Sequence, residues 1–452
     1  MSKLLIKLCR ALGYAGSNLP GRVALFLYPR ILARLSGQCR SGAVLVTGTN
    51  GKTTTALMLT GILNRAGLTV VHNRSGANLI SGITATYLQA CDWRGRMKAA
   101  IGVAEVDEAS VARVVREMPV RAIVVTNFFR DQLDRFGELD HTVTLVGRGL
   151  ELLGDKAWAL LNADDPLVAG LAGARRGPIT FYGVEADADP GEHHPAREIR
   201  YCSRCELPFR YLAVTYGHLG HYRCPGCGDG RPVPDIAVTG IWQGGAGAGS
   251  LLAVRTGRGP VELAVPLPGM YNVYNALAAV ACSDALDLPW QAVEEGLAAF
   301  TASFGRMERL AVDGREVLLI LVKNPAGFNE VIRILLRDGD CADVLIAINN
   351  KYADGTDVSW LWDVDFERLV AGARLDRVTV AGTRAEAMAV RLKYAGLDRG
   401  VTMCSDLGDA LRVALQGPGP GGRLYVLPTY TAMLGLRDAI RRLGYARRYW
   451  EA

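Results

Sequence analysis

The chain has 452 residues and a formal net charge of +6, with 50% hydrophobic and 21% charged residues. This composition excludes an intrinsically disordered protein, and the length predicts roughly two to four domains. No stretch approaches the ~20 apolar residues of a membrane span, which excludes an integral membrane protein. The modest positive charge suits an enzyme of anionic substrates better than a protein that coats duplex nucleic acid.

Residues 1–40 are predicted to form an amphipathic N-terminal extension of two helical pieces. The second piece, RVALFLYPRILARLSG, is rich in Arg and Leu. We expect it to pack on the body of the protein, and contact with a membrane surface is the alternative.

From residue 43 onward, short apolar runs alternate with helical periods, which predicts a doubly wound α/β sheet with buried parallel strands. The predicted strands cover 43–48, 99–106, 122–127 and 157–162. Residues 173–250 interrupt this rhythm with Pro, Gly, His and Cys and are interpreted as an insertion, before a long helix predicted over 272–286. We expect this central domain to span 41–309.

A second alternation predicts a smaller, Rossmann-like α/β domain over 310–452. Its predicted strands cover 317–322, 343–348, 377–382 and 423–430.

The sharpest motif lies between the first predicted strand and a helix: Gly48, Thr49, Asn50, Gly51, Lys52, Thr53 and Thr54. A glycine-rich turn at this place brings backbone N–H groups close to a polyphosphate at a helix N-terminus. Lys52 is expected to reach the β- and γ-phosphates, and the Thr53 hydroxyl to bind Mg²⁺.

Two CxxC pairs, Cys202 with Cys205 and Cys224 with Cys227, have the spacing of a zinc ribbon. Four thiolates leave no open position, so we expect a structural Zn²⁺ site in an insertion at about 198–232. A ribbon that binds nucleic acid is disfavoured because its surroundings are neither strongly basic nor aromatic. The nearby His193, His194, His218 and His221 are interpreted as surface residues. Six scattered cysteines indicate a reducing cytoplasm.

The shortened phosphate loop TGTNGKTTT resembles that of the Mur ligase superfamily, the ATP-dependent amide-forming enzymes of peptidoglycan synthesis, to which folylpolyglutamate synthase is related. Further segments follow in the order of that family. They are Glu105–Glu108, Thr126-Asn127, Asn162–Asp165, Gly269–Asn275 and Arg306–Glu308.

The resemblance implies ATP and Mg²⁺ as cofactors and an acyl-phosphate intermediate. It assigns Mg²⁺ to Glu105 and Thr53, adenine to Asn275 and the nucleotide to Arg306; Glu108 is a weaker candidate in the same acidic segment. The chain departs from the superfamily where Tyr271 and Gln132 replace histidines. It also has no lysine between His141 and Gly154, which leaves a second Mg²⁺ open.

The C-terminal segments, together with the cysteine pairs, resemble the MurT family, the synthetase subunits of lipid II isoglutaminyl synthase. These segments are VKNPAGFNEVI (322–332), NNKYADGTDVSWLWDVDFE (349–367) and LPTYTAML (427–434). This resemblance implies a heterodimer with a glutaminase subunit (GatD) that contacts the C-terminal domain. An aspartate of this chain, Asp357 or alternatively Asp354, would complete the partner's Cys-His-Asp triad. Lys323 and Asn324 are candidates to face the acyl phosphate.

We therefore expect ATP-dependent amidation of the D-glutamate α-carboxylate in the lipid II stem peptide, at the cytoplasmic face of the membrane and without nucleic acid. Lys52, Glu105 and Asp357 are the expected catalytic residues. The alternative is a stand-alone Mur-type or folylpolyglutamate-type ligase that adds an amino acid.

Overall fold

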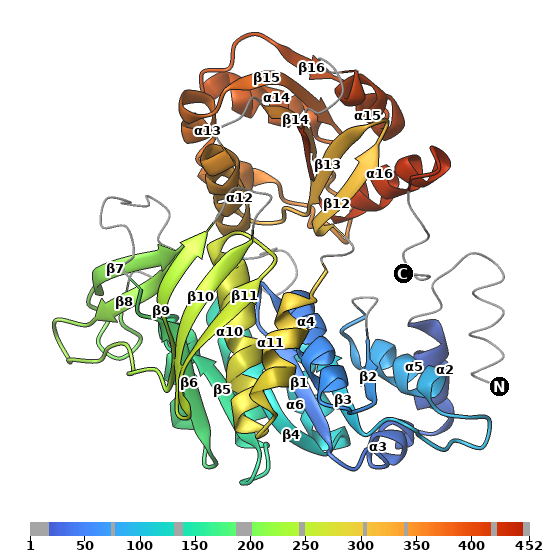
Figure 1. Cartoon of the computed structure of the whole chain (residues 1–452), viewed down its shortest axis with the longest axis vertical. Helices are drawn as coiled ribbons and strands as arrows, with labels where there is room; N and C mark the ends of the chain where they lie inside the picture. Colours follow the sequence, from blue (N-terminus) through green and yellow to red (C-terminus); the bar gives the residue numbers. More distant parts are fainter. Residues whose placement is uncertain are drawn as a thin grey trace.

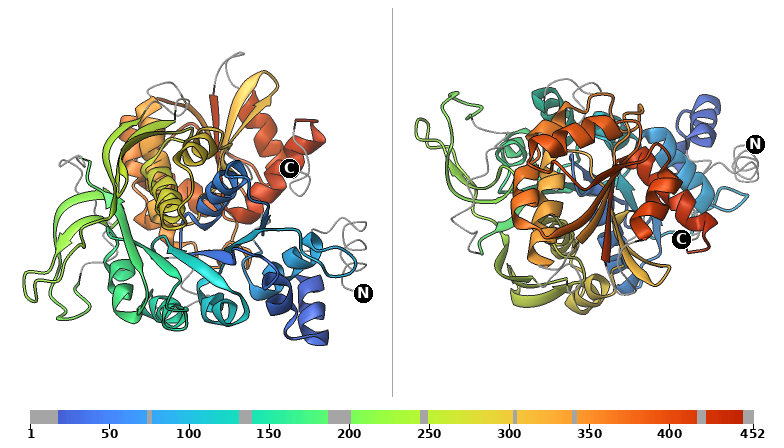
Figure 2. Two further views of the ribbon diagram at one scale, coloured as in Figure 1. Left: turned by 60° about the horizontal axis from the view of Figure 1, so that its bottom comes forward. Right: turned by 90° about the horizontal axis from the view of Figure 1, so that it is seen from above.

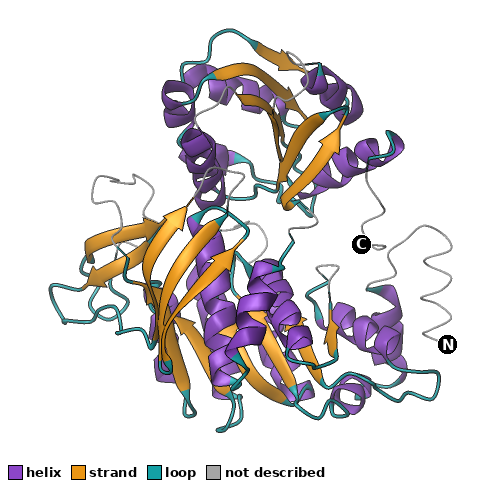
Figure 3. Cartoon of the chain, viewed as in Figure 1, coloured by secondary structure: helices purple, strands orange, loops and turns teal. Residues whose placement is uncertain are grey.

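The computed structural model describes residues 18–73, 77–130, 139–186, 201–243, 249–301, 305–338, 342–416 and 423–445. In these ranges two large sheets lie one above the other along the long axis of the molecule (Figure 1). The strand orders are β11-β10-β9-β6-β5-β4-β1-β3-β2 and β12-β13-β17-β14-β15-β16. Figure 3 shows helices flanking both sheets, as the predicted α/β class requires.

The centre of the first sheet is a run of parallel strands that the sequence largely predicts. These strands are β1 (Ala43–Thr47), β2 (Val70–His72), β3 (Ile101–Glu105), β4 (Val120–Val125), β5 (Trp158–Asn162) and β6 (Ile179–Val184). Alternate residues of β1 enter different cores, Val44 and Val46 on one side and Leu45 on the other. A strand buried on both faces is continuously apolar, which explains why the sequence reveals it.

The interpretation of residues 173–250 as an insertion is wrong at both ends of that range. β6 pairs with β5, and β9 (Ile236–Gln243) pairs with β6, so both belong to the first sheet. β10 (Ser250–Thr256) and β11 (Gly259–Val265) extend the sheet as an antiparallel edge. Within the described part of 173–250, the strands outside this sheet are the hairpin β7 (Arg210–Tyr216) and β8 (Leu219–Arg223).

Helices cover both faces of the first sheet (Figure 2, left). One face carries α4 (Lys52–Arg65), α10 (Met270–Ala285) and α11 (Trp290–Ala298). The other face and the adjoining edge carry α2 (Leu19–Leu27), α3 (Ile31–Ser36), α5 (Ile80–Ala90), η1 (Glu108–Ser110), α6 (Val111–Glu117), α8 (Leu139–Glu151), α9 (Pro166–Gly170) and η2 (Leu171–Ala174). The helix predicted over 272–286 is therefore confirmed as α10, and its residues 272–283 are all buried.

The second sheet is parallel except for its first strand. Its strands are β12 (Arg306–Val312), β13 (Arg315–Ile320), β14 (Ala342–Ala347), β15 (Leu375–Ala381), β16 (Val401–Met403) and β17 (Arg423–Pro428). The accompanying helices are α12 (Pro325–Asp338), η3 (Ser359–Asp363), α13 (Phe366–Gly372), α14 (Ala385–Tyr394), α15 (Leu407–Leu415) and α16 (Tyr430–Arg442). The four strands predicted here are present. β12 begins at Arg306, slightly before the expected domain limit at 310.

No described helix is both long and apolar enough to cross a membrane. Residues 1–17 of the expected extension, residues 198–200 of the expected insertion and Gln132 lie outside the described ranges.

The packing of α11 on α4 gives a test of the first domain. A Cβ atom added at Gly296 would lie 2.7 Å from the Ile62 Cα atom, so the two backbones meet without room for a methyl group. We expect Gly296→Ala to lower the free energy of unfolding by about 1–3 kcal/mol, as overpacking does. Urea unfolding followed by circular dichroism measures this. The control is Gly173→Ala in η2, which meets nothing within 4 Å; an equal loss in both variants would contradict the packing argument.

Candidate active site

The loop between β1 and α4 has a backbone that requires glycine. Gly48 and Gly51 have φ angles of +117° and +87°, which residues with a side chain rarely adopt. A Cβ at Gly51 would lie 2.0 Å from the Oδ1 atom of Asn275, and one at Gly48 2.4 Å from the Oγ1 atom of Thr126. The strand–loop–helix context predicted for residues 48–54 is therefore present, with the start of α10 pressed against the loop.

Two motifs from later strands hold this loop in place. The Thr126 hydroxyl donates to the Asn50 carbonyl oxygen over 2.7 Å, and the Asn50 N–H donates to Asn127 Oδ1 over 2.9 Å. The Asn162 amide donates in turn to the Thr126 carbonyl oxygen over 2.9 Å. The segments at 126–127 and 162–165 thus act as supports behind the loop.

Lys52, the first residue of α4, lies in a strongly acidic environment. Its ammonium donates to the Gly48 carbonyl oxygen over 2.5 Å and to Glu108 Oε1 over 2.7 Å. Burial alone would lower the pKa of Lys52, but the carboxylates of Glu108, Glu105 and Asp107 raise it above its ordinary value. Lys52 is therefore a fixed cation, and Glu108, grouped by sequence with the Mg²⁺ segment, is its ion-pair partner.

Thr53 and Glu105 form the most suitable place for a divalent cation beside the loop. The Thr53 hydroxyl donates to Glu105 Oε2 over 2.7 Å, and both side chains are buried. A hydroxyl and a carboxylate oxygen are ligands that Mg²⁺ accepts together with waters and phosphate oxygens. The second sheet supplies Arg306, whose Nη2 donates to the Thr53 hydroxyl over 3.1 Å.

Lys323 and Asn324 reach the same loop from the second sheet. Lys323 Nζ donates to the Thr49 carbonyl oxygen over 3.0 Å, and Asn324 Nδ2 donates to Asn50 Oδ1 over 3.1 Å. These two residues directly precede α12. The loop is therefore clamped between the two sheets by residues that lie more than 270 positions apart in the chain.

A cavity lies where the two sheets meet at this loop, with about 740 Å³ of space that includes its open mouth. Two buried donors on its wall, Asn50 Nδ2 and Arg306 Nε, have no hydrogen-bond partner among the described residues. Unpaired donors and cations suit an anionic ligand, and an aromatic and amide wall suits a base. That wall consists of Tyr216, Tyr271, Asn272, Tyr274 and Asn275.

Asp164 and Asp165, adjacent in the chain, have different roles. Asp165 caps α9 and accepts from the Phe128 N–H over 2.8 Å. Asp164 accepts from Arg231 Nε over 2.5 Å and from the Tyr274 hydroxyl over 2.6 Å. Burial raises the pKa of Asp164 even though Arg231 opposes the shift. Through these hydrogen bonds, Asp164 connects the end of β5 to α10 and to the segment that follows the β7–β8 hairpin. The sequence pattern alone did not reveal this role.

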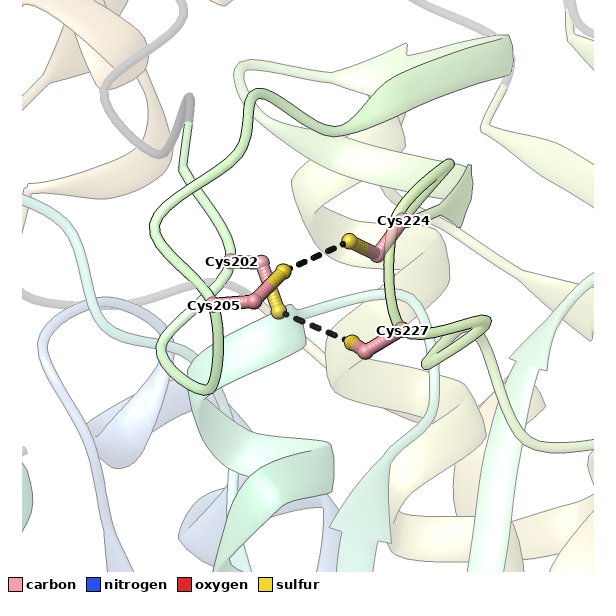
Figure 4. A group of neighbouring side chains, drawn as sticks. All are labelled: Cys202, Cys205, Cys224 and Cys227. Atoms are coloured by element: carbon pink, nitrogen blue, oxygen red, sulfur yellow. Dashed lines mark hydrogen bonds between the residues drawn. The ribbon is translucent and has the colours of Figure 1, made fainter.

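The four predicted metal ligands face one another (Figure 4), two in the segment before β7 and two in the segment after β8. The Cys202 and Cys227 sulfurs lie 3.6 Å apart, those of Cys205 and Cys224 3.3 Å apart, and all four within 4.8 Å of one another. Tetrahedral Zn–S bonds of ~2.3 Å separate sulfurs by about 3.8 Å, so this donor set fits Zn²⁺.

The pKa values of these thiols reflect their crowding. The backbone N–H of Cys227 lowers the pKa of the Cys224 thiol to about 6. A backbone hydrogen bond from Asp229 also lowers the pKa of Cys227, but burial and the neighbouring sulfurs together raise it to about 12. A divalent cation bound between the four sulfurs would favour the thiolate form of all four cysteines, because its charge offsets the repulsion between neighbouring thiolates.

The turn between β7 and β8 points inward, which no sequence pattern predicts. Tyr216 lines the cavity, and its ring centroid lies 5.1 Å from that of Phe129. The expectation that His218 is a surface residue is wrong: it is fully buried, with Nε2 3.3 Å from Asp165 Oδ2. His221 is half-buried and pairs with the Val184 carbonyl oxygen, while His193 and His194 lie outside the described residues.

Asp354 and Asp357, between which the sequence did not decide, occupy different environments. Asp354 is buried and accepts from the Thr431 N–H over 2.6 Å, which fixes its loop to the start of α16. Asp357 is exposed and accepts from the Ser359 N–H and hydroxyl, both over 2.8 Å. Of the two, Asp357 has the carboxylate that another protein could reach.

Comparisons with known proteins agree with this arrangement. The family description "Mur ligase middle domain" matches residues 46–220, and "MurT ligase C-terminal" matches residues 321–433. The chain is 33% identical over 442 residues to the lipid II isoglutaminyl synthase (glutamine-hydrolyzing) subunit MurT of Staphylococcus aureus, covering 98% of this chain and 97% of that protein. It is 35% identical over 430 residues to the subunit of the same name from Streptococcus pneumoniae, covering 94% and 92%.

The chain belongs to the MurT family. The resemblance drawn from the sequence is thereby confirmed.

Solved structures of related fold include MurF of Acinetobacter baumannii, with a TM-score of 0.69 at 18% identity, covering 93% of this chain and 80% of that one. Folylpolyglutamate synthase of Mycobacterium tuberculosis has a TM-score of 0.62 at 16% identity, covering 96% and 99%. Both are similar in fold, and this chain thus has the α/β architecture of Mur ligases.

Tyr216, at the inward turn of the β7–β8 hairpin, lines the cavity, so the shape of the cavity depends on the four cysteines that flank this hairpin. We expect Cys205→Ser/Cys224→Ser to weaken binding of a fluorescent ATP analogue several-fold, because Tyr216 and the Phe129 contact lose their anchor. Fluorescence titration of the purified variant measures this, with Cys91→Ser as the control, since Cys91 is buried on α5's side of the sheet. Unchanged binding by the double variant would contradict the link.

Proposed function

We propose that this chain is the ATP-dependent synthetase subunit that amidates the α-carboxylate of D-glutamate in the stem peptide of lipid II. The observation that carries the proposal is the convergence of Lys52, Arg306 and Lys323 on one glycine loop beside the Thr53–Glu105 pair. The identity of about one third to MurT subunits over nearly their whole length supports this substrate.

The chemistry explains why this set of residues is needed. A carboxylate oxygen is a poor leaving group, so the γ-phosphoryl group of ATP is transferred to it, and ammonia then displaces phosphate from the acyl phosphate. Lys52 and Arg306 would offset negative charge on the transferring phosphoryl group, and Lys323, which contacts the Thr49 carbonyl oxygen from the second sheet, would add to this. Thr53 and Glu105 would hold Mg²⁺, which neutralises phosphate charge when bound.

The ammonia is proposed to come from a glutaminase subunit. A glutaminase nucleophile needs an accessible, easily ionised thiol. Burial instead raises the pKa of Cys282 to about 12 and raises that of Cys39. Cys91 is buried as well. These described cysteines are poorly suited to release ammonia from glutamine, which supports a partner that does so.

Asp357 is the proposed contribution of this chain to that partner's active site. Its carboxylate is exposed and held by Ser359 ahead of η3, so it is oriented without being buried. Exposed aromatic residues of the same region, Tyr352 and Trp362, suit a protein interface. The aspartate would orient the partner's catalytic histidine, as in Cys-His-Asp triads.

The four cysteines are proposed to hold a structural Zn²⁺. A complete set of four thiolates leaves no ligand position for water, so the ion would stabilise the hairpin and take no part in the reaction.

The decisive test of the synthetase is Lys52→Ala. With the glutaminase subunit, ATP, glutamine and lipid II, we expect the wild-type complex to form ADP and amidated lipid II, and the variant to lose roughly a hundredfold or more in rate, because the fixed cation is gone. Mass spectrometry of lipid II measures this. Lys156→Ala, which removes an exposed lysine, serves as the control. Amidation that persists in Lys52→Ala, or a peptide bond formed by the lone chain with an amino acid, would refute the proposal.

Asp357→Asn separates the two half-reactions. We expect it to abolish amidation with glutamine and to leave amidation with a high ammonium concentration unchanged, because free ammonia makes the partner's triad unnecessary. The matched control is Asp363→Asn, which changes an exposed carboxylate at the end of η3. Equal loss with both nitrogen sources would place Asp357 in the synthetase reaction instead.

A further inference from the structure

One corner of the molecule has an unusual surface. We define the N-terminal corner as residues 18–40, which contain α2 and α3, together with residues 92–98 of the loop after α5. Figure 1 shows α2, α3 and α5 together at one edge of the first sheet, and the β7–β8 hairpin lies at the opposite side. Figure 2, left, shows the same separation.

Helix α2 packs on the protein with its small residues. Pro20, Gly21 and Ala24 are its buried residues, and a Cβ at Gly21 would lie 1.7 Å from the Ser81 carbonyl oxygen of α5. Leu25 is partly buried against the core, but Phe26 and Leu27 face outward and are 87% and 54% exposed. A helix on a globular protein normally buries its large apolar side chains. The reversed arrangement indicates that the outer side of α2 contacts something apolar.

All charged residues of the segment 18–40, which contains α2 and α3, are positively charged. Arg22, Arg30, Arg34 and Arg40 are exposed, and within the described residues none of them has an ion-pair partner. The first 91 residues of the chain contain ten Lys and Arg but no Asp or Glu, whereas the whole chain has a net charge of only +6. The remainder of the chain is therefore net acidic, and its positive charge is concentrated at this end.

The loop after α5 continues the same surface. Gln38, just after α3, donates to the Gly95 carbonyl oxygen over 3.0 Å and accepts from the Met97 N–H over 2.9 Å. This loop carries Trp93, which is 65% exposed, and three exposed basic residues, Arg94, Arg96 and Lys98. Exposed tryptophan beside basic residues is typical of surfaces at a membrane–water interface.

We propose that the N-terminal corner binds the surface of an anionic lipid bilayer, with Phe26, Leu27 and Trp93 entering the headgroup region and the arginines contacting lipid phosphates. Apolar insertion and attraction to anionic lipids add together in such peripheral binding. A second copy of the chain fits this surface poorly, because a symmetric contact would bring the same unpaired arginines together.

The corner is also connected to the active site. Helix α5, on which α2 packs, begins at Ile80, and the preceding Asn78 carbonyl oxygen accepts from the Asp107 N–H over 3.0 Å. Asp107 lies between Glu105 and Glu108 of the site. Membrane contact at this corner would therefore bring the site close to a lipid-anchored substrate; this last step rests on the proposed function, whereas the lipid binding itself does not.

Co-sedimentation of the full chain with vesicles tests the proposal without nucleotide or substrate. We expect binding to vesicles of phosphatidylcholine and phosphatidylglycerol in equal parts, little binding to pure phosphatidylcholine, and weaker binding as salt is added. Phe26→Ser/Leu27→Ser should reduce binding at least about tenfold, and each of Arg30→Glu and Arg34→Glu roughly fivefold or more. The control is Leu212→Ser, which removes a 72% exposed apolar residue on β7.

Circular dichroism and the thermal midpoint of each variant establish that it is folded. Absence of binding by the wild-type chain, or equal losses in the Leu212→Ser control, would overturn the proposal. So would a concentration-dependent dimer, seen by analytical ultracentrifugation, that Phe26→Ser/Leu27→Ser disrupts without any vesicle binding. Because these measurements require no ligase activity, their failure is distinguishable from failure of the proposed function.

Discussion

The structure depends on how one short loop is held between two sheets. Residues 48–51 contain two glycines with positive φ angles. Two lysines donate to the carbonyl oxygens of this loop: Lys52, at the start of the following helix α4, and Lys323, from the second sheet. Thr126 and Asn127 fix the loop from behind, and Arg306 reaches Thr53 at its end. A loop so constrained keeps one backbone arrangement, which is what recognition of a phosphate chain requires. Because Arg306 and Lys323 come from the second sheet, the geometry of the site also depends on where that sheet lies relative to the loop.

Much of this arrangement could be predicted from sequence because the determinants are local. The strands β1, β3, β4 and β5 are continuous apolar runs, and the glycine loop follows β1 directly. By contrast, β6 and β9 were read as insertion because Pro, Gly and Cys surround them, although they pair with the central sheet. Their assignment depends on pairing partners that are distant in the sequence, and a local pattern does not contain that information.

The same reason explains the errors in the site. His218 lies in a polar, turn-rich segment that is typical of a surface, but the hairpin folds back so that this ring is buried between Asp165 and Phe129. Sequence patterns single out Asp164 only within the Asn162–Asp165 segment, and its contacts to Arg231 and Tyr274 come from positions 67 and 110 residues away. The choice between Asp354 and Asp357 likewise needed burial, since both are loop aspartates with similar neighbours in the sequence.

The ion pair between Lys52 and Glu108 has a consequence for selectivity. The loop lysine is neutralised by the Glu108 carboxylate 2.7 Å away, so an incoming anion must compete with an internal one. A lone phosphate ion would engage only part of the cleft and would gain less elsewhere. Under the proposed function, a triphosphate would meet the loop, Arg306 and the aromatic wall at once, which would offset the loss of the internal ion pair. The pair between Lys52 and Glu108 would thereby favour a nucleotide over inorganic phosphate.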